Sequence, residues 1–163
     1  MIAEYLNSLS EPAARAALTR CCGAARWVER LVAARPFASD AALFAAAERA
    51  WWDLGPENWR EAFAGHPRLG ARGGDKGGEW SRREQAGLDG ASAAMRRALA
   101  EGNRAYEERF GHVFLLCATG KSAAEMLAEL TSRLANDPGR ELRIAAGEQA
   151  KITRLRLEKL VTS

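Results

Sequence analysis

Apolar residues recur every three to four positions along most of the chain, and short polar or glycine-containing stretches interrupt this pattern. Such a period predicts amphipathic helices rather than strands. The interruptions divide the sequence into eight predicted helices, at about residues 10–22, 24–34, 39–54, 56–64, 81–88, 89–110, 122–136 and 140–161. Before the last two of them, a short apolar run at 112–118 (HVFLLCA) is either strand-like or simply buried and extended.

The composition also favours a helical fold. Alanine occurs 34 times in 163 residues, whereas valine and isoleucine together occur only seven times. Alanine favours helices, and a shortage of β-branched residues disfavours a sheet. The mass of 17.7 kDa is that of one ordinary domain, and we see neither an internal repeat nor a domain boundary. We therefore predict an all-α, single-domain helical bundle of about seven to eight helices that spans residues 1–163.

The cysteines and the N-terminus bear on where the protein is found. Cys21, Cys22 and Cys117 are odd in number and lack CxxC spacing, which disfavours a disulfide framework and fits a reducing compartment. Cys117 lies in the apolar run, so we interpret it as an inert core thiol. No signal peptide is visible, and no apolar run reaches the roughly 18 residues of a membrane span. We expect a cytoplasmic protein that does not bind membranes.

The charge leaves two classes of function open. The net charge is +3, the isoelectric point is about 9.0, and 20 of the 24 basic residues are arginine. One alternative is a small basic all-α module that binds nucleic acid. The other is a protein whose arginines hold an acidic small molecule, because arginine binds carboxylates with two hydrogen bonds. We find neither a helix-turn-helix signature nor a basic cluster interleaved with aromatic residues, so the second alternative is favoured.

A glycine-rich stretch contains the first candidate for chemistry. Residues 65–79 include six glycines, and they form either a flexible linker or a loop over a site. His66 lies at the start of this stretch, and Pro67 favours an extended backbone at His66. Imidazole can transfer protons near neutral pH. His66 is therefore either a candidate acid–base group or a loop histidine without a role.

Three other polar residues also allow two interpretations each. Ser81 and Glu84 fit a capping box, in which they only hold a helix end. Alternatively, that helix start faces the same cleft as His66 and attracts an anionic ligand. Arg156 lies among leucines and either extends to the surface or turns inward to hold a carboxylate. The two histidines are 46 positions apart and no nucleotide-phosphate motif is present, so we expect no metal and no cofactor.

Four ordered sequence blocks, taken together, are more specific than any one of these residues. They closely resemble the OHCU decarboxylases, whose full name is 2-oxo-4-hydroxy-4-carboxy-5-ureidoimidazoline decarboxylase. The similarity covers nearly the whole chain and includes Arg133-Leu134-x-Asn136-Asp137. The four blocks are His66-Pro67-x-Leu69, Ser81-x-x-Glu84-Gln85-Ala86-Gly87-Leu88, Asn103-x-x-Tyr106-x-x-x-Phe110-Gly111-x-x-Phe114 and Lys151-Ile152-x-x-Leu155-Arg156-Leu157.

The resemblance implies a cofactor-free enzyme of urate breakdown that removes CO2 from OHCU and yields (S)-allantoin. It also implies an all-α bundle, commonly a homodimer, whose partner is a small-molecule substrate and not a nucleic acid. Matched position by position, His66 corresponds to the catalytic histidine of the family and Glu84 to its acidic partner. The resemblance assigns substrate binding to Pro67, Ser81, Gln85, Phe114, Leu115, Leu116, Cys117, Ala118 and Arg156.

Overall fold

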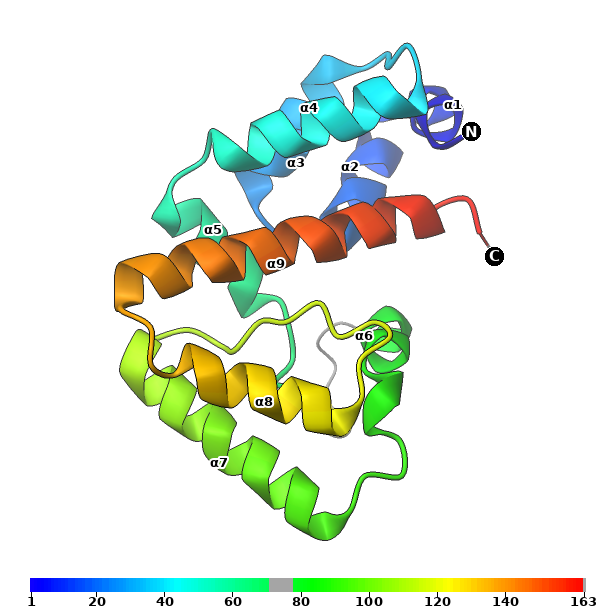
Figure 1. Cartoon of the computed structure of the whole chain (residues 1–163). Coiled ribbons are helices and arrows are strands. Elements are labelled where there is room, and N and C mark those ends of the chain that lie inside the picture. Colours follow the sequence, from blue (N-terminus) through cyan, green and yellow to red (C-terminus); the bar gives the residue numbers. More distant parts are fainter. Residues whose placement is uncertain (71–77, 163) are drawn as a thin grey trace. The chain divides into compact units, whose positions relative to one another are not determined.

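The computed structural model in Figure 1 describes residues 1–70 and 78–162. Every regular element in these ranges is helical, which confirms the all-α prediction. The same ranges contain nine α-helices, one more than predicted, and one 3-10 turn. No helix in the described part of the chain combines the length and the apolar character that crossing a membrane requires. The elements are α1 (Ile2–Ser8), α2 (Glu11–Cys21), α3 (Ala25–Ala34), α4 (Asp40–Trp52), α5 (Pro56–Ala64), α6 (Gly78–Glu84), η1 (Ala86–Leu88), α7 (Ala93–Phe110), α8 (Ala123–Arg133) and α9 (Pro138–Lys159).

The helix that the sequence pattern did not predict is α1. It has seven residues and no side-chain cap at its own N-terminus. Its first turn is held by Asp40, which accepts hydrogen bonds from the backbone nitrogen of Ala3 (2.9 Å) and from the terminal amino group of Met1 (3.2 Å). A carboxylate satisfies the free amides at a helix start and is favoured there by the helix dipole. The helix therefore depends on a residue 37 positions away, which no local pattern shows.

The described residues form two compact units, and α9 contributes to both. Unit 1 comprises Met1–Ala62 and Ala150–Ser163. Within it, α3 packs against α2 and α4. Leu18, Trp27 and Leu43 have no solvent-exposed surface in this helical core. The indole nitrogen of Trp27 donates a hydrogen bond to the backbone oxygen of Ala47 at 3.0 Å, which satisfies the one polar atom that this side chain buries.

Unit 2 comprises Phe63–Gln149. Its helices α7 and α8 lie side by side (Figure 1). Gly102 permits this close approach, because a Cβ atom at that position would lie only 2.5 Å from a methyl carbon of Leu130. Buried apolar and aromatic residues fill the space between these helices and the neighbouring loops. They are Leu69, Leu88, Leu99, Tyr106, Phe114, Leu116, Ala118, Met126 and Leu130.

Several predicted helix boundaries are confirmed and others are corrected. The capping box of Ser122 and Glu125 at the start of α8 is present as predicted. The helix predicted from residue 89 begins instead at Ala93, because the side chain of Ser92 caps it by accepting a hydrogen bond from Met95 N at 3.1 Å. The last helix begins at Pro138 rather than at 140. Asp137 caps that helix, and proline is well tolerated in a first turn.

Candidate functional site

His66 lies directly after α5, and a side chain from α9 contacts it. Its backbone nitrogen donates to the oxygen of Phe63 at 3.0 Å, which closes the last turn before Pro67. The imidazole is half-buried, and its Nε2 lies 2.7 Å from Oε1 of Gln149. Gln149 is completely buried, so the imidazole is held by a side chain that cannot turn away into water. The histidine at the start of the glycine-rich stretch is therefore an oriented group.

The backbone that follows His66 is tied down by two amide side chains. Asn103 Nδ2 donates to the oxygen of Leu69 at 2.8 Å, and the backbone nitrogen of Gly70 donates to Gln85 Oε1 at 2.9 Å. Gln85, a residue that the resemblance assigns to substrate binding, thus connects its own turn to the loop that carries His66. Residues 71–77, the middle of the glycine-rich stretch, lie outside the described residues.

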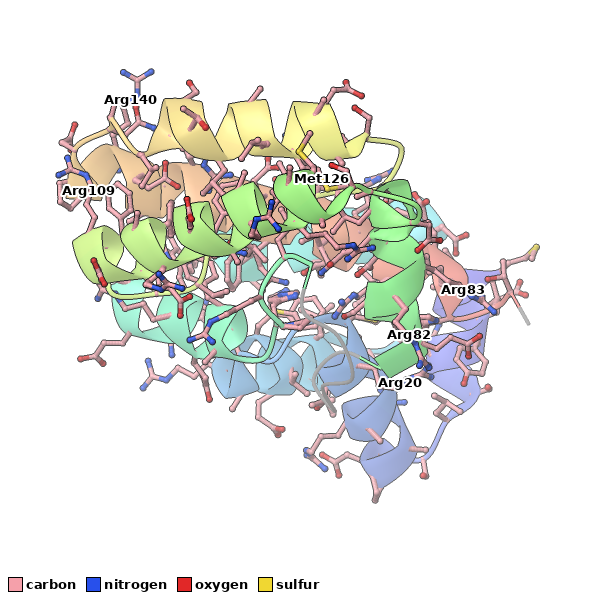
Figure 2. All side chains as sticks on the ribbon, turned by 90° about the horizontal axis from the view of Figure 1, so that it is seen from below. Arg20, Arg82, Arg83, Arg109, Met126 and Arg140 are labelled. Carbon is pink, nitrogen blue, oxygen red and sulfur yellow. The ribbon has the colours of Figure 1, made fainter. Side chains whose placement is uncertain are left out.

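The helix α6 corrects the prediction for Ser81 and Glu84. Because α6 begins at Gly78, Ser81 lies inside the helix and not at its N-cap, so the capping-box prediction was wrong. An ion pair between Glu79 and Arg83 (2.7 Å) spans the turn that contains Ser81. Arg82 and Arg83 are exposed and point outward (Figure 2).

Ser81 and Glu84 themselves are buried. Their exposed fractions are 5% and 8%, and their spacing of three residues places them on the same face of α6. A buried carboxylate and a buried hydroxyl on one helix face are costly to maintain unless they have polar partners. This burial favours the functional interpretation of the two residues over a role at a solvated helix end.

The segment from Phe114 to Ala118 is buried without forming a strand. Phe114, Leu115, Leu116 and Ala118 are buried, and Cys117 is half-buried. Two charged side chains hold its backbone: Arg133 Nη1 donates to the oxygen of Leu115 at 2.8 Å, and Glu148 Oε1 accepts from the nitrogen of Cys117 at 3.0 Å. Of the two predicted alternatives, the buried extended chain is confirmed. Its backbone is fixed well enough to present polar groups in defined directions.

A buried ionic network supports this segment. Glu141 accepts hydrogen bonds from Arg133 Nη2 (2.6 Å), from the hydroxyl of Tyr106 (2.5 Å) and from Asn136 Nδ2 (3.0 Å). Burial, followed by the bond to Glu141, raises the pKa of Tyr106 far above its usual value. Burial by itself would lower the pKa of Arg133, but the hydrogen bond and the charge of Glu141 outweigh it and raise that pKa. Arg133 therefore keeps its positive charge at neutral pH.

Arg156 lies in unit 1, in the part of α9 that follows Gln149. Its exposed fraction is 7%, so the interpretation as a side chain extended into solvent was wrong. Nη1 donates to the backbone oxygen of Arg20 at 3.4 Å within the same unit. The other residues assigned by the resemblance, including Pro67 directly after His66, belong to unit 2.

The sequence patterns did not identify Glu148 and Gln149. Both are buried polar residues on α9, and each contacts a predicted site element. A signal for Gln149 exists in the sequence: it lies four residues after Ala145 and three before Ile152, on the helix face that is buried in the structure. A glutamine at a core position needs a hydrogen-bond partner. This position could have been predicted to face a polar group.

A cavity of about 510 Å³ lies in unit 2, between the loop at Leu69 and α7. Its described lining includes none of the predicted site residues. Two of its arginines are already occupied, since Arg68 pairs with Glu107 at 2.8 Å and Arg96 donates to the oxygen of Leu88 at 2.8 Å. We therefore place the candidate site at His66. Among the described residues, no group of three or more His, Cys, Asp or Glu side chains is arranged to hold a metal ion.

The described helices and the groups around His66 define a small all-helical protein with a candidate acid–base site. Residues 7–158 match the family model described as OHCU decarboxylase, and the chain belongs to this family. The family that the sequence blocks indicated is thereby confirmed.

Individual relatives agree with the family match. The chain is 35% identical over 145 residues to the "Uric acid degradation bifunctional protein TTL" of Arabidopsis thaliana, covering 86% of this chain and 45% of that protein. It is 43% identical over 83 residues to 2-oxo-4-hydroxy-4-carboxy-5-ureidoimidazoline decarboxylase of Mus musculus, covering 50% of this chain and 47% of that protein. The matches thus span about half the length of these curated relatives.

A solved structure extends the similarity to the fold. A crystal structure of OHCU decarboxylase in the presence of (S)-allantoin superposes with a TM-score of 0.78 at 34% sequence identity. The match covers 89% of this chain and 96% of that one.

Proposed function

We propose that this chain is a carboxy-lyase that converts OHCU to (S)-allantoin in urate breakdown. The observation that carries the proposal is the family match over residues 7–158, which runs through both units. The similarity to an OHCU decarboxylase crystallised with (S)-allantoin supports the same substrate and product. Because the match is continuous, we also propose that residues 1–163 act as one functional domain.

The reaction breaks the bond between a ring carbon and the carboxylate, and CO2 leaves while the electron pair stays on the carbon. Conjugated C=N and carbonyl groups of the substrate delocalise this pair. The protein then contributes orientation, stabilisation of charge and a proton for the carbon. His66 is the proposed acid–base group, which takes the hydroxyl proton or delivers one to carbon. Its half-buried position and its bond to Gln149 support this role.

Glu84 is the proposed acidic partner of the reaction. Its buried carboxylate would orient His66 or bind the substrate hydroxyl directly. Ser81 on the same helix face, Pro67, Gln85, the backbone of 114–118 and Arg156 are proposed to bind substrate. The two charged contacts that fix Leu115 and Cys117 support a binding role for that backbone. A homodimer, a cytoplasmic location and catalysis without a cofactor stay predictions.

The test follows freshly generated OHCU and records whether the protein accelerates the appearance of optically active allantoin. We expect acceleration that survives dialysis against a strong chelator. Absence of acceleration would refute the proposed activity. Activity that is lost on dialysis and restored by one divalent ion would instead contradict only the prediction of cofactor-free catalysis.

Two variants in the same assay test the roles of His66 and Glu84. General acid–base groups contribute roughly 10²–10⁴-fold, so His66→Ala should lose about that much turnover and stay folded. Glu84→Gln keeps the shape and removes the charge, so it should lower kcat strongly with little change in melting temperature. Glu125→Gln is the matched control, because glutamine also satisfies a capping box. Near-normal kcat for His66→Ala or Glu84→Gln would remove that residue from the mechanism.

A further inference from the structure

The two histidines of the chain make opposite ring contacts. His66 uses Nε2, which lies 2.7 Å from Oε1 of Gln149. His112 uses Nδ1, which lies 3.1 Å from the backbone oxygen of Val113. A carbonyl oxygen only accepts hydrogen bonds, so the nitrogen that faces it must carry the proton. In the neutral state, these contacts select the Nε2–H tautomer for His66 and the Nδ1–H tautomer for His112.

We infer that Gln149 is a positioning residue that fixes His66 as the Nε2–H tautomer, which makes Nδ1 the nitrogen that exchanges the proton with the substrate. The inference rests on the proposed function for the identity of that substrate. A histidine whose one nitrogen is held by a fixed acceptor has a defined tautomer and ring direction, and its other nitrogen is then the basic one. Gln149 acts through His66 and is not itself placed against the reacting atoms.

The environment of Gln149 argues against a purely structural role. Its side chain has no solvent-exposed surface, and the buried residues Ala145 and Ile152 flank it on α9. An apolar side chain of the same length would avoid the cost of burying an amide. The contact to His66 is a reason for glutamine at this position.

The preceding residue strengthens the argument. Glu148 accepts a hydrogen bond from the backbone nitrogen of Cys117 at 3.0 Å. One turn of α9 therefore holds both the proposed acid–base group and the backbone segment that is proposed to bind substrate. A small shift of this turn would move both together, whereas the loss of the Gln149 amide removes the contact to His66 Nε2 and leaves the Glu148 contact in place.

Nuclear magnetic resonance of protein labelled with ¹⁵N-histidine tests the tautomer without any assay of activity. At a pH where both imidazoles are neutral, we expect His66 to show a protonated Nε2 and a bare Nδ1, and His112 to show the reverse. The spectrum of His66→Ala assigns the two rings. A protonated Nδ1 on His66, or an even mixture of tautomers, would overturn the inference.

The variant Gln149→Met removes the acceptor at similar side-chain length. We expect a mixture of His66 tautomers and a kcat that falls about tenfold to hundredfold, the scale found for side chains that orient metal-ligating histidines, while KM stays within a few-fold. Glu148→Gln is the control, because it keeps an acceptor for Cys117 and should leave the His66 tautomer unchanged.

Gln149→Met with wild-type tautomer and kcat would refute the positioning role. An inactive wild-type protein with the expected tautomer would refute the proposed function and the link to that substrate, but not the tautomer itself.

Discussion

Unit 1 and unit 2 bury different kinds of side chain. The fully buried residues that join α2, α3 and α4 in unit 1 are apolar, such as Leu18 and Leu31. Unit 2 adds to its apolar cluster the ion pair of Arg133 and Glu141, which is 4% and 0% exposed. Packing of helix faces stabilises the first unit largely through buried apolar area. The second unit also depends on polar bonds, which stabilise only while every partner is present.

The difference follows from the backbone. Helices satisfy their own amides and carbonyls, whereas an irregular buried chain needs other partners. In unit 2, side chains supply them: Arg133 bonds Leu115 O, and Glu148 bonds Cys117 N. Asn103 in the same way bonds Leu69 O. Unit 2, which contains most of the predicted site residues, thus fixes non-helical backbone with buried polar side chains, whereas Asn7, which bonds the backbone of Phe37 in unit 1, is half-buried. This arrangement suits a binding site, because such backbone can direct its polar groups at a ligand.

The largest predicted effect comes from breaking the buried ion pair. Arg133→Met leaves Glu141 buried without its cation, and removing one partner of a buried pair typically costs about 3–5 kcal/mol. We expect a loss of that size in the free energy of unfolding, measured by urea denaturation. The double variant Arg133→Met, Glu141→Leu should recover part of it, because no uncompensated charge remains.

An exposed ion pair in unit 1 gives the matched control. Arg15 Nε lies 2.6 Å from Glu29 Oε2, and both side chains are largely exposed. Arg15→Met should barely move the melting temperature, because exposed pairs are screened by water and salt. If Arg15→Met and Arg133→Met cost the same, the contrast between the two units would be wrong.

The cysteines of unit 1 give the second prediction. Burial raises the pKa of Cys22 to about 11 and that of Cys21 to about 12. Two pKa units mean about a hundredfold fewer thiolates at pH 8 than an ordinary thiol has. In the variant Cys117→Ser, which keeps only these two thiols, we expect native labelling by an aromatic disulfide to be slower than denatured labelling by at least about that factor.

The raised pKa values of the two cysteines also predict how the free energy of unfolding changes with pH. An unfolded thiol loses its proton near pH 8.5, whereas folded Cys22 keeps its proton up to about pH 11. The folded state binds more protons in that window, so the free energy of unfolding should fall as the pH rises through it. Fast native labelling, or unchanged stability over this window, would show that water reaches the core of unit 1.

Local signals predicted most helices, and a remote contact explains why α1 was not predicted. Ser39 and Ser122 cap helices with their own side chains, so their starts can be read from the sequence. α1 depends on Asp40, which is remote in sequence. Ser81 has the sequence of a cap, but α6 begins three residues before it, at Gly78. A pattern that fits a cap does not exclude an earlier start.

The candidate site, like the fold, was predictable only where the signal is local. His66 is conspicuous, because histidine is rare in the chain and Pro67 follows it. Gln149 is 83 residues further along the chain. The helical period that predicts α9 does not show that this residue contacts His66. A pairing between a loop and a distant helix face depends on tertiary packing. In the sequence, only the position of a glutamine between Ala145 and Ile152 on the predicted helix indicates that it needs a polar partner.

Glycine substitutions give a smaller effect with opposite signs. A Cβ atom at Gly87 would lie 1.8 Å from the backbone oxygen of Lys121, so η1 or the loop before α8 must move to accept it. Overpacking of this kind typically costs about 1–3 kcal/mol. Gly147 is inside α9 with nothing within 4 Å of a new Cβ atom. Gly147→Ala should therefore stabilise the protein by about 0.5–1 kcal/mol. A Gly87→Ala variant as stable as the wild type would show that these segments of unit 2 are not closely packed.

The smallest effect compares one kind of contact in both units. Ser39 accepts a hydrogen bond from Ala42 N at 3.1 Å in unit 1, and Ser122 accepts one from Glu125 N at 3.1 Å in unit 2. Replacing such a cap by alanine typically costs about 1 kcal/mol. Both bonds are exposed and local, so Ser39→Ala and Ser122→Ala should lower the free energy of unfolding equally. Ser39→Ala should also speed hydrogen exchange at the amide of Ala42, and Ser122→Ala at the amide of Glu125. Equal losses would confine the difference between the units to their buried groups. A markedly larger loss for Ser122→Ala would mean that the polar network of unit 2 extends to its surface, and the contrast would then lie in the whole unit rather than in its core.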